Sequence, residues 1–369
     1  MRVRFLSAAA LAVASAAFGA GLPLPNIELP KDSPVALLSS DYSGSSEAAR
    51  GGALVLELHA ALTLRNVGGR RIRGVTLLVE AQQATPGGKA SVTLTGLNAA
   101  AGESFPVRID LRLLRPVQLA RGGAVDVRLD GVLFDDLSFY GPNRLNSRRS
   151  MVVYEMEARR DRRYFKALLD SGPEKLRQAV LESLSRQTSQ PDMEVRLARN
   201  GRATNREAGR QLELAMLDFP DAPVEPRNGA ATIAGNEARD PRLEVRNRSA
   251  RTVRSVEVAW ILRDAGGREF PAGSTPSEIY LAPGERRDIM KDATLRFPGR
   301  PGAGLAIAGM TGYVSSVEFA DGKVWVPSRL SLDDSRLAHA APSSPEEQRL
   351  LLIYRRRGLT ALIDELKKF

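Results

Sequence analysis

The chain has 369 residues, of which 43% are hydrophobic and 26% are charged, and its formal net charge is +10. This length exceeds one ordinary domain and suits two, and the composition is that of a globular protein, which excludes an intrinsically disordered chain. Cysteine is absent, which excludes disulfides, thiolate metal sites, cysteine nucleophiles and a lipidated cysteine.

Residues 1–20 have the layout of a secretory signal peptide. Arg2 and Arg4 precede an uncharged, alanine-rich apolar stretch from Phe5 to Phe18 that ends among small residues. A buried first helix is the alternative, and the flanking arginines oppose it. We therefore expect an exported protein, periplasmic or secreted, with no transmembrane segment after the signal is removed.

The most specific signal in the sequence is an internal repeat. Residues 62–77 and 243–258 share six identities over sixteen positions at an offset of 181. Three more pairs of segments match in the same order along the chain: 27–35 with 217–224, 97–103 with 281–285, and 132–136 with 317–321. Four matches in one order indicate a tandem duplication.

Alternating polarity predicts strands in each copy. Apolar residues occupy every second position from Leu54 to Leu64, a turn cluster follows at 66–69, and Ile72 to Val79 is again apolar and β-branched. Together these segments predict a β-hairpin. Later strands, at 125–134 and 313–319, end at tight turns, and Asp321-Gly322 favours a two-residue hairpin turn.

Helical spacing follows the strands in both copies. It covers residues 154–185 in the first copy, and in the second it begins with the capping box Ser344-Pro345-Glu346-Glu347. Residues 187–210 are polar and predict a linker that holds at most one edge strand. We therefore expect a first module at 21–186 with helices at 154–185, a linker at 187–210, and a second module at 211–369 with helices at 344–367.

The sequence around the turn resembles a known family. An Asn-small-small turn, an apolar strand ending near Asp264, and Leu281-Ala-Pro-Gly-Glu285 are similar to the immunoglobulin-like accessory domains of bacterial exported proteins, of the FxLYD type. The first copy departs from this pattern because it lacks the proline before Gly102. The resemblance implies a β-sandwich and a non-catalytic accessory role. The expected fold class is mainly β with α: two tandem immunoglobulin-like β-sandwich modules, each followed by a C-terminal helical segment.

Motifs for catalysis, metals or cofactors are not found. The two histidines, His59 and His339, do not align between the copies and have no ligand neighbours at suitable spacing. No Gly-x-Ser-x-Gly elbow or phosphate-binding glycine loop is present. We therefore expect no cofactor, no metal and no enzyme. An envelope hydrolase with a carboxylate pair stays open as an alternative, and turn chemistry is the other interpretation of its candidates, Asp135, Asp136, Asp333 and Asp334.

The leading hypothesis is an exported, non-enzymatic protein that binds another protein or a cell-envelope polymer. Its candidate binding residues are Tyr140, Trp325, Arg159, Arg160, Arg163, Arg355 and Arg356. The aromatic residues form either an exposed platform or buried positions that close the sandwich. The arginines form either solvated helix faces, interleaved with Glu155, Glu157 and Asp161, or a patch for an anionic polymer; nucleic acid is not an expected partner.

Overall fold

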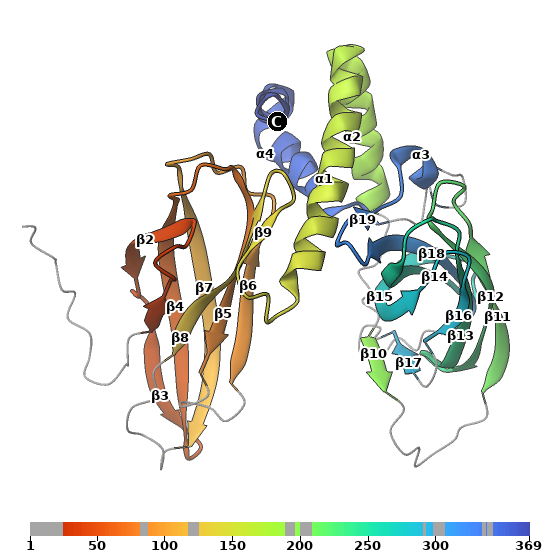
Figure 1. The fold of residues 1–369 in the computed structure, drawn as a ribbon, viewed down its shortest axis with the longest axis horizontal. Coiled ribbons are helices and arrows are strands. Elements are labelled where there is room, and N and C mark those ends of the chain that lie inside the picture. Colours follow the sequence, from red (N-terminus) through yellow and green to blue (C-terminus); the bar gives the residue numbers. More distant parts are fainter. Residues whose placement is uncertain are drawn as a thin grey trace, which may run out of the picture. The chain divides into compact units, whose positions relative to one another are not determined.

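The computed structural model describes residues 25–81, 88–116, 125–188, 196–199, 209–290, 293–297, 307–333, 337 and 342–369. The chain forms two compact units, residues 1–145 and 146–369. Strands predominate in both and four helices are described, so the prediction of a mainly β protein with α is confirmed (Figure 1). The predicted signal peptide lies outside the described residues, and none of the described helices is long and apolar enough to cross a membrane.

The first unit encloses one apolar core between two sheets. One sheet has the order β1-β8-β5-β6 with β9 paired to β8, and in the other β4 lies between β7 on one side and β2 and β3 on the other. Leu62, Val75, Val107 and Val132 come from both sheets and are fully buried. The strands are β1 (Asn26–Glu28), β2 (Val35–Asp41), β3 (Ser46–Arg50), β4 (Ala53–Asn66), β5 (Ile72–Glu80), β6 (Lys89–Leu94), β7 (Ser104–Pro116), β8 (Asp126–Phe134) and β9 (Phe139–Tyr140).

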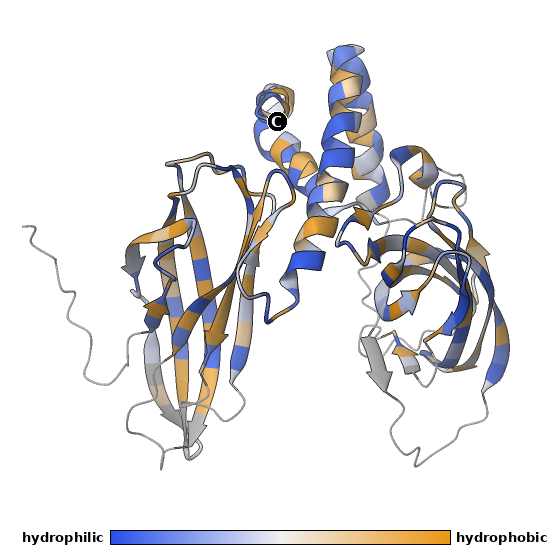
Figure 2. Cartoon of the chain, viewed as in Figure 1, coloured by the Kyte–Doolittle hydropathy of each residue, from blue (hydrophilic) through white to orange (hydrophobic). Residues whose placement is uncertain are grey.

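The predicted hairpin between Leu54–Leu64 and Ile72–Val79 is not formed. Both segments are strands, β4 and β5, but β4 pairs with β2, β3 and β7, whereas β5 pairs with β6 and β8. The turn at 66–69 carries the chain from one sheet to the other. Both strands contribute buried apolar residues to the same core, and Figure 2 marks apolar residues of the first unit in orange. Polarity alone does not decide which neighbour a strand pairs with.

The second unit contains one curved ten-stranded sheet, in the order β10-β17-β13-β12-β11-β18-β14-β15, with β16 paired to β13 and β19 to β18. Residues 210–214 of β11 pair with β12 and residues 215–217 pair with β18, so β11 joins the two halves around the core. Trp260 and Phe297 are fully buried there. The strands are β10 (Arg196–Arg199), β11 (Arg210–Leu217), β12 (Val224–Ala234), β13 (Glu237–Asn247), β14 (Val253–Asp264), β15 (Glu269–Leu281), β16 (Arg286–Ile289), β17 (Ala293–Arg296), β18 (Ile307–Phe319) and β19 (Val324–Trp325).

The four helices are α1 (Ser147–Asp170), α2 (Pro173–Thr188), α3 (Arg329–Leu332) and α4 (Pro345–Lys367). The predicted cap of α4 is formed, because the Ser344 hydroxyl accepts the N–H of Glu347 at 3.1 Å and proline follows the cap. The turn at Asp321 differs from its prediction. The N–H of Phe319 donates to the carbonyl of Lys323, which leaves three connecting residues, and Gly322 supplies the positive φ of 77°.

The helices that were expected to close the first module belong to the second unit. Phe165 of α1 and Val180 of α2 share one apolar cluster with Leu350 and Leu362 of α4. The units therefore divide at residues 145 and 146, and not within 187–210. Helical spacing identifies an apolar stripe, but it does not say which element covers that stripe. Part of the predicted linker, β10, is an edge strand that pairs with β17.

Candidate functional site

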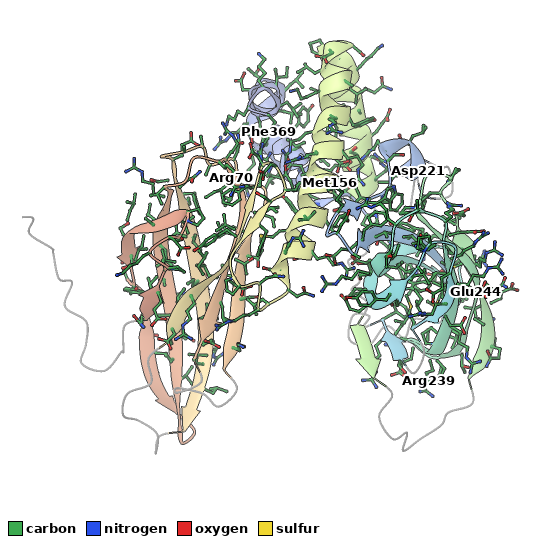
Figure 3. The ribbon with its side chains drawn as sticks, in the orientation of Figure 1. Arg70, Met156, Asp221, Arg239, Glu244 and Phe369 are labelled. Carbon is green, nitrogen blue, oxygen red and sulfur yellow. The ribbon has the colours of Figure 1, made fainter. Side chains whose placement is uncertain are left out.

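The charged face of α1 is a buried ion-pair network, which corrects the expectation of a solvated face. Arg162 Nη2 lies 3.1 Å from Glu155 Oε2, and Arg162 Nε lies 3.0 Å from Glu346 Oε1 of α4. These three residues are only 4%, 1% and 1% exposed. The Arg162 guanidinium also lies 4.1 Å from the ring centroid of Phe369 (Figure 3). Another helix covers this face, and spacing along α1 alone could not reveal it.

The predicted arginines divide into two groups. Arg159 pairs with Glu155 at 2.9 Å, and Arg160 pairs with Asp161 at 2.8 Å, so both belong to the network on α1. The others are exposed and have no ion-pair partner among the described residues: Arg163, Arg355 and Arg356. The structure therefore ties the first group to carboxylates of its own unit.

The two predicted aromatic residues are half-buried. Tyr140 in β9 packs against the core of the first unit, and burial, followed by its hydrogen bond with Asp32, raises the pKa of its phenol. Trp325 in β19 packs against the core of the second unit. Each lies in a short strand, β9 or β19, that pairs with the preceding strand of its sheet, and each contributes to the packing of its own core.

The predicted carboxylates accept hydrogen bonds in turns. The hydroxyl and the N–H of Ser138 donate to Asp136 and hold the pKa of its carboxyl below the ordinary value. Asp321 accepts the N–H of Lys323 at 3.1 Å, which lowers the pKa of Asp321 in the same way. Asp135 donates its N–H to the carbonyl of Arg71.

The remaining candidates from the sequence lie apart from one another. Asp333 is 3.6 Å from Arg329, and His59 Nδ1 is 2.7 Å from Asp110 on the surface of the first unit. Asp334 and His339 lie outside the described residues.

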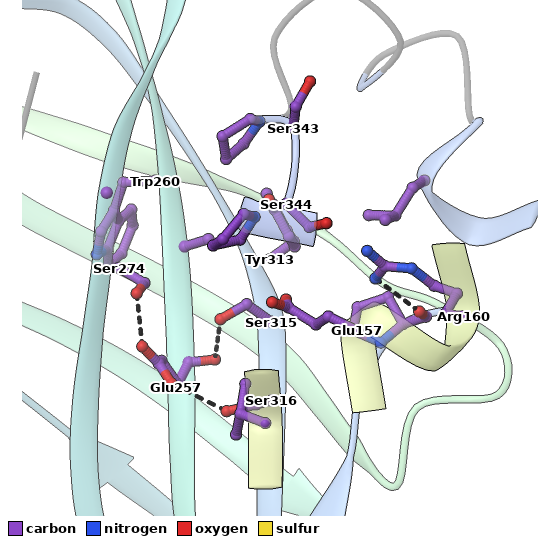
Figure 4. A pocket seen from close by; sticks show the side chains of 17 residues that line it. Glu157, Arg160, Glu257, Trp260, Ser274, Tyr313, Ser315, Ser316, Ser343 and Ser344 are labelled. Carbon is purple, nitrogen blue, oxygen red and sulfur yellow. Dashed lines mark hydrogen bonds between the residues drawn. The ribbon is translucent and has the colours of Figure 1, made fainter. Parts of the chain in front are cut away.

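A cavity of about 310 Å³ lies in the second unit, on the face of β14 and β18 that is opposite the main core (Figure 4). α1 and the segment before α4 form its other walls. Its ionisable groups are Glu157 and Arg160 of α1, Glu257 of β14 and Tyr313 of β18. Apolar and hydroxyl side chains complete the lining, among them Leu332 of α3 and also Val153, Ser315 and Ser343.

The two carboxylates of the cavity differ in their partners. Glu257 accepts hydrogen bonds from Ser274 at 2.5 Å and Ser316 at 3.0 Å (Figure 4). Arg149 lies 3.4 Å from it. Glu157 has no hydrogen-bond partner among the described residues, and burial raises the pKa of its carboxyl to about 7. Glu257 is therefore hydrogen-bonded within its own unit, whereas Glu157 is not.

A second candidate site is the free edge of β7 in the first unit. This strand of 13 residues pairs with β4 over its whole length and with no other strand in the described part of the chain. Just before β7 begins, the N–H of Asn66 donates to the backbone carbonyl of Glu103 at 2.9 Å. The N–H of Gly102 donates to the backbone carbonyl of Asn66 at 2.8 Å. Residues of β4 with the parity of Asn66 therefore direct their backbone groups toward β7.

The pairing register then decides which residues of β7 face outward. Val107 and Ile109 lie opposite Leu62 and Ala60, so their backbone groups bond to β4. The alternate residues direct their backbone groups to the free edge: Pro106, Arg108, Asp110 and Arg112. Pro106 has no N–H to donate, which suits a position that points away from the partner strand.

The second unit has a strand at the corresponding edge. β17 pairs antiparallel with β13 on one side and with β10 on the other. Both sites escaped the sequence reasoning. Alternation at residues 104–114 would have identified β7 as a strand, but its free edge follows from topology, and the isolation of Glu157 follows from the sheet that α1 covers.

Comparison with family models finds no match for this chain, and comparison with curated protein sequences finds none. Among solved structures, a β-glucosidase from Kluyveromyces marxianus is similar over 73% of the chain at 8% identity, with a TM-score of 0.15, and the chain spans 44% of its length. A bacterial adhesin from Mobiluncus mulieris is similar over 76% of this chain and 96% of its own, at 10% identity and a TM-score of 0.17. Scores this low carry no argument about fold or activity.

Proposed function

We propose that the protein is an exported, non-enzymatic binding protein of two tandem immunoglobulin-like modules, and that its first module captures an extended segment of another protein along β7. The observation that carries the proposal is the free edge of β7, which is 13 residues long. An open sheet edge offers a row of backbone donors and acceptors to which an extended segment adds as a further strand.

Two asparagines support the tandem duplication. Asn66 and Asn247 are fully buried, and the side-chain amide of each donates to the carbonyl four residues later, at 2.8 Å in both copies. Each amide also donates to the strand-turn segment that follows, to Ala99 at 3.0 Å and to Leu281 at 2.9 Å. A buried asparagine with the same four-residue and long-range partners in each half is expected if the halves share one ancestor.

The sheets repeat the same details. β1 pairs parallel with β8, and β11 pairs parallel with β18. The β5–β8 ladder shifts register after Thr76, and the β14–β18 ladder shifts after Glu257, 181 positions later. The arginine four residues after each asparagine lies 3.9 Å from the ring centroid of Phe134 or Phe319. These matches support one module type used twice.

In the second module a strand of the same chain already adds to the edge of the sheet. Its edge strand β17 is covered by β10, a short segment of the same chain. The equivalent strand of the first module, β7, is left with outward backbone groups at Arg108, Asp110 and Arg112. The side chains of Arg108 and Arg112 are exposed, and Asp110 already holds His59. The captured segment is therefore expected to carry acidic residues four positions apart, opposite the two arginines.

Site-specific photo-crosslinking in the native envelope tests the proposal. A benzoylphenylalanine at position 112 should label one other protein, whereas the same residue in place of Arg246 should not, because Arg246 is paired with Glu225 on one side and with Arg286 on the other. A peptide from the labelled region should slow amide hydrogen exchange at Arg108 and Arg112. The variant Arg108→Pro should abolish labelling from position 112, since it removes an outward donor and leaves the β4 ladder intact.

Several outcomes would overturn this assignment. Labelling of only a second copy of the chain would identify self-association, and labelling of glycan alone would identify a polymer ligand. Equal labelling from positions 112 and 246 would show nonspecific contact. The export part of the proposal rests on Arg2, Arg4 and the apolar stretch that follows, and the N-terminal sequence of the protein recovered from cells tests it.

A further inference from the structure

The cavity of the second unit holds a carboxylate whose charge the unit compensates only in part, through Arg160. Glu157 projects from α1 toward the outer face of the sheet, where Tyr313 and Ser315 of β18 line the opposite wall (Figure 4). It has no hydrogen-bond partner among the described residues. Glu157 is half-buried, and partial burial of a carboxylate disfavours its charged form, so a cation or a strong donor placed beside it is favoured.

The charged neighbours of Glu157 are already occupied. Arg160, one turn along α1, makes a two-pronged pair with Asp161 at 2.8 and 3.1 Å and donates to the carbonyl of Pro327. Glu257 on β14 is satisfied by two serines and Arg149. The segment before α4 brings serines and prolines and no charge. The nearby groups thus leave one negative charge without a matching positive one.

The uncharged side chains that line the cavity determine which kind of molecule fits beside Glu157. Val153, Pro327 and Leu332 contribute apolar surface, and the ring of Tyr313 stands beside the carboxylate. A volume of about 310 Å³ accommodates a molecule of roughly ten non-hydrogen atoms, at the small end of ligand sites. An aromatic ring next to a carboxylate also favours a cation, because its face is electron-rich.

We propose that this cavity binds a small amphipathic primary amine, whose ammonium group pairs with Glu157 and whose apolar body lies against Val153, Pro327 and Leu332. The site is separate from the edge of β7, because it is built entirely from the second unit. Loss of one activity would therefore leave the other unchanged, and their tests are independent.

Three probes of one size that differ in charge test the proposal on the full chain: phenethylammonium, 2-phenylethanol and phenylacetate. Calorimetry at pH 8 should show binding of the ammonium compound at least tenfold tighter than the alcohol and none of the carboxylate. The affinity of the ammonium compound should fall about tenfold or more at pH 5.5. Arg160, Asp161, Glu257 and Tyr313 surround Glu157 and shape its titration, but burial is its main cause.

The variant Glu157→Gln keeps the shape of the side chain and removes the charge. It should lose the preference for the ammonium compound over the alcohol, and the control Glu174→Gln, on an exposed residue of α2, should keep it. Circular dichroism and the unfolding midpoint establish that both variants are folded. Equal binding of the amine and the alcohol, or an unchanged amine affinity in Glu157→Gln, would overturn the assignment.

Discussion

Arg162 and Glu346 are bonded side chain to side chain at 3.0 Å although 184 positions separate them in the chain. Arg162 also binds Glu155, and Glu346 also binds Arg349 at 2.8 Å, so the pair belongs to a network that links α1 to α4. Both partners are almost completely removed from solvent. Such a network favours one packing of α1 against α4, because a buried charge is strongly destabilising unless it lies beside its partners.

Removal of Arg162 should therefore destabilise the second unit strongly. Arg162→Ala removes one of the two arginines that pair with Glu155 and one bond of Glu346, both in buried positions, and we expect a loss of about 3–5 kcal/mol in the free energy of unfolding. Urea unfolding followed by circular dichroism measures it. The adjacent Arg163→Ala is the control, since that side chain is exposed, and it should change stability by less than about 0.5 kcal/mol. Similar losses in both variants would contradict a buried network.

The raised pKa of Glu157 predicts a pH-dependent stability. The folded state holds this proton up to about pH 7, whereas the ordinary value is 4.5, so the folded state binds more protons between these values. The free energy of unfolding should then decrease by up to about 3 kcal/mol as the pH rises through this window. In Glu157→Gln this decrease should be absent. Urea titrations at pH 4.5 and 7.5 test this. A variant that follows the same pH profile as the natural chain would exclude Glu157 as the cause.

The buried asparagines predict paired effects in the two units. Asn66→Ala and Asn247→Ala each remove a buried side-chain donor from two backbone carbonyls, and we expect each to cost about 2–4 kcal/mol. The first change should lower the unfolding transition of the first unit and the second that of the second unit, by calorimetry. Asn228→Ala, at an exposed position of β12, is the matched control. A large effect in one unit alone would argue against equivalent roles of the two asparagines.

Gly131 predicts a steric limit in the first unit. A Cβ at this position would lie 2.1 Å from Cζ of Phe139, so Gly131→Ala must displace that ring. We expect a loss of about 1–3 kcal/mol and a changed environment for the neighbouring β9, visible in the ring resonances of Phe139 and Tyr140. Gly69→Ala meets no atom within 4 Å and should leave both unchanged. Unperturbed Phe139 resonances in Gly131→Ala would contradict this packing.

The sequence predicted helices and strands correctly where apolar residues recur with a single period, that of a strand or that of a helix. β4 and β5 were expected at 54–64 and 72–79 and extend over Ala53–Asn66 and Ile72–Glu80. The start of α4 followed from its capping box, because Ser344 and Glu347 interact within a single turn. Information of this kind lies within a few residues of the chain.

Properties that depend on distant partners could not be predicted. The separation of β4 and β5 into different sheets depends on β7 and β8, which come later in the chain. The burial of Glu155 and Asp161 depends on α3 and α4, and the isolation of Glu157 depends on the face of β14 and β18. Charged residues at helical spacing look alike in sequence whether water or another helix covers them.

The assignment of α1 and α2 to the second unit has a practical consequence for anyone who dissects this chain. Truncation at residue 210, the natural choice from the sequence, would strip Arg162 from Glu346 and uncover the leucines of α4. A fragment that begins at residue 146 keeps those partners together, and its complement ends after Leu145 with every strand of its sandwich present. The module borders expected from the sequence and the borders of the compact units therefore differ.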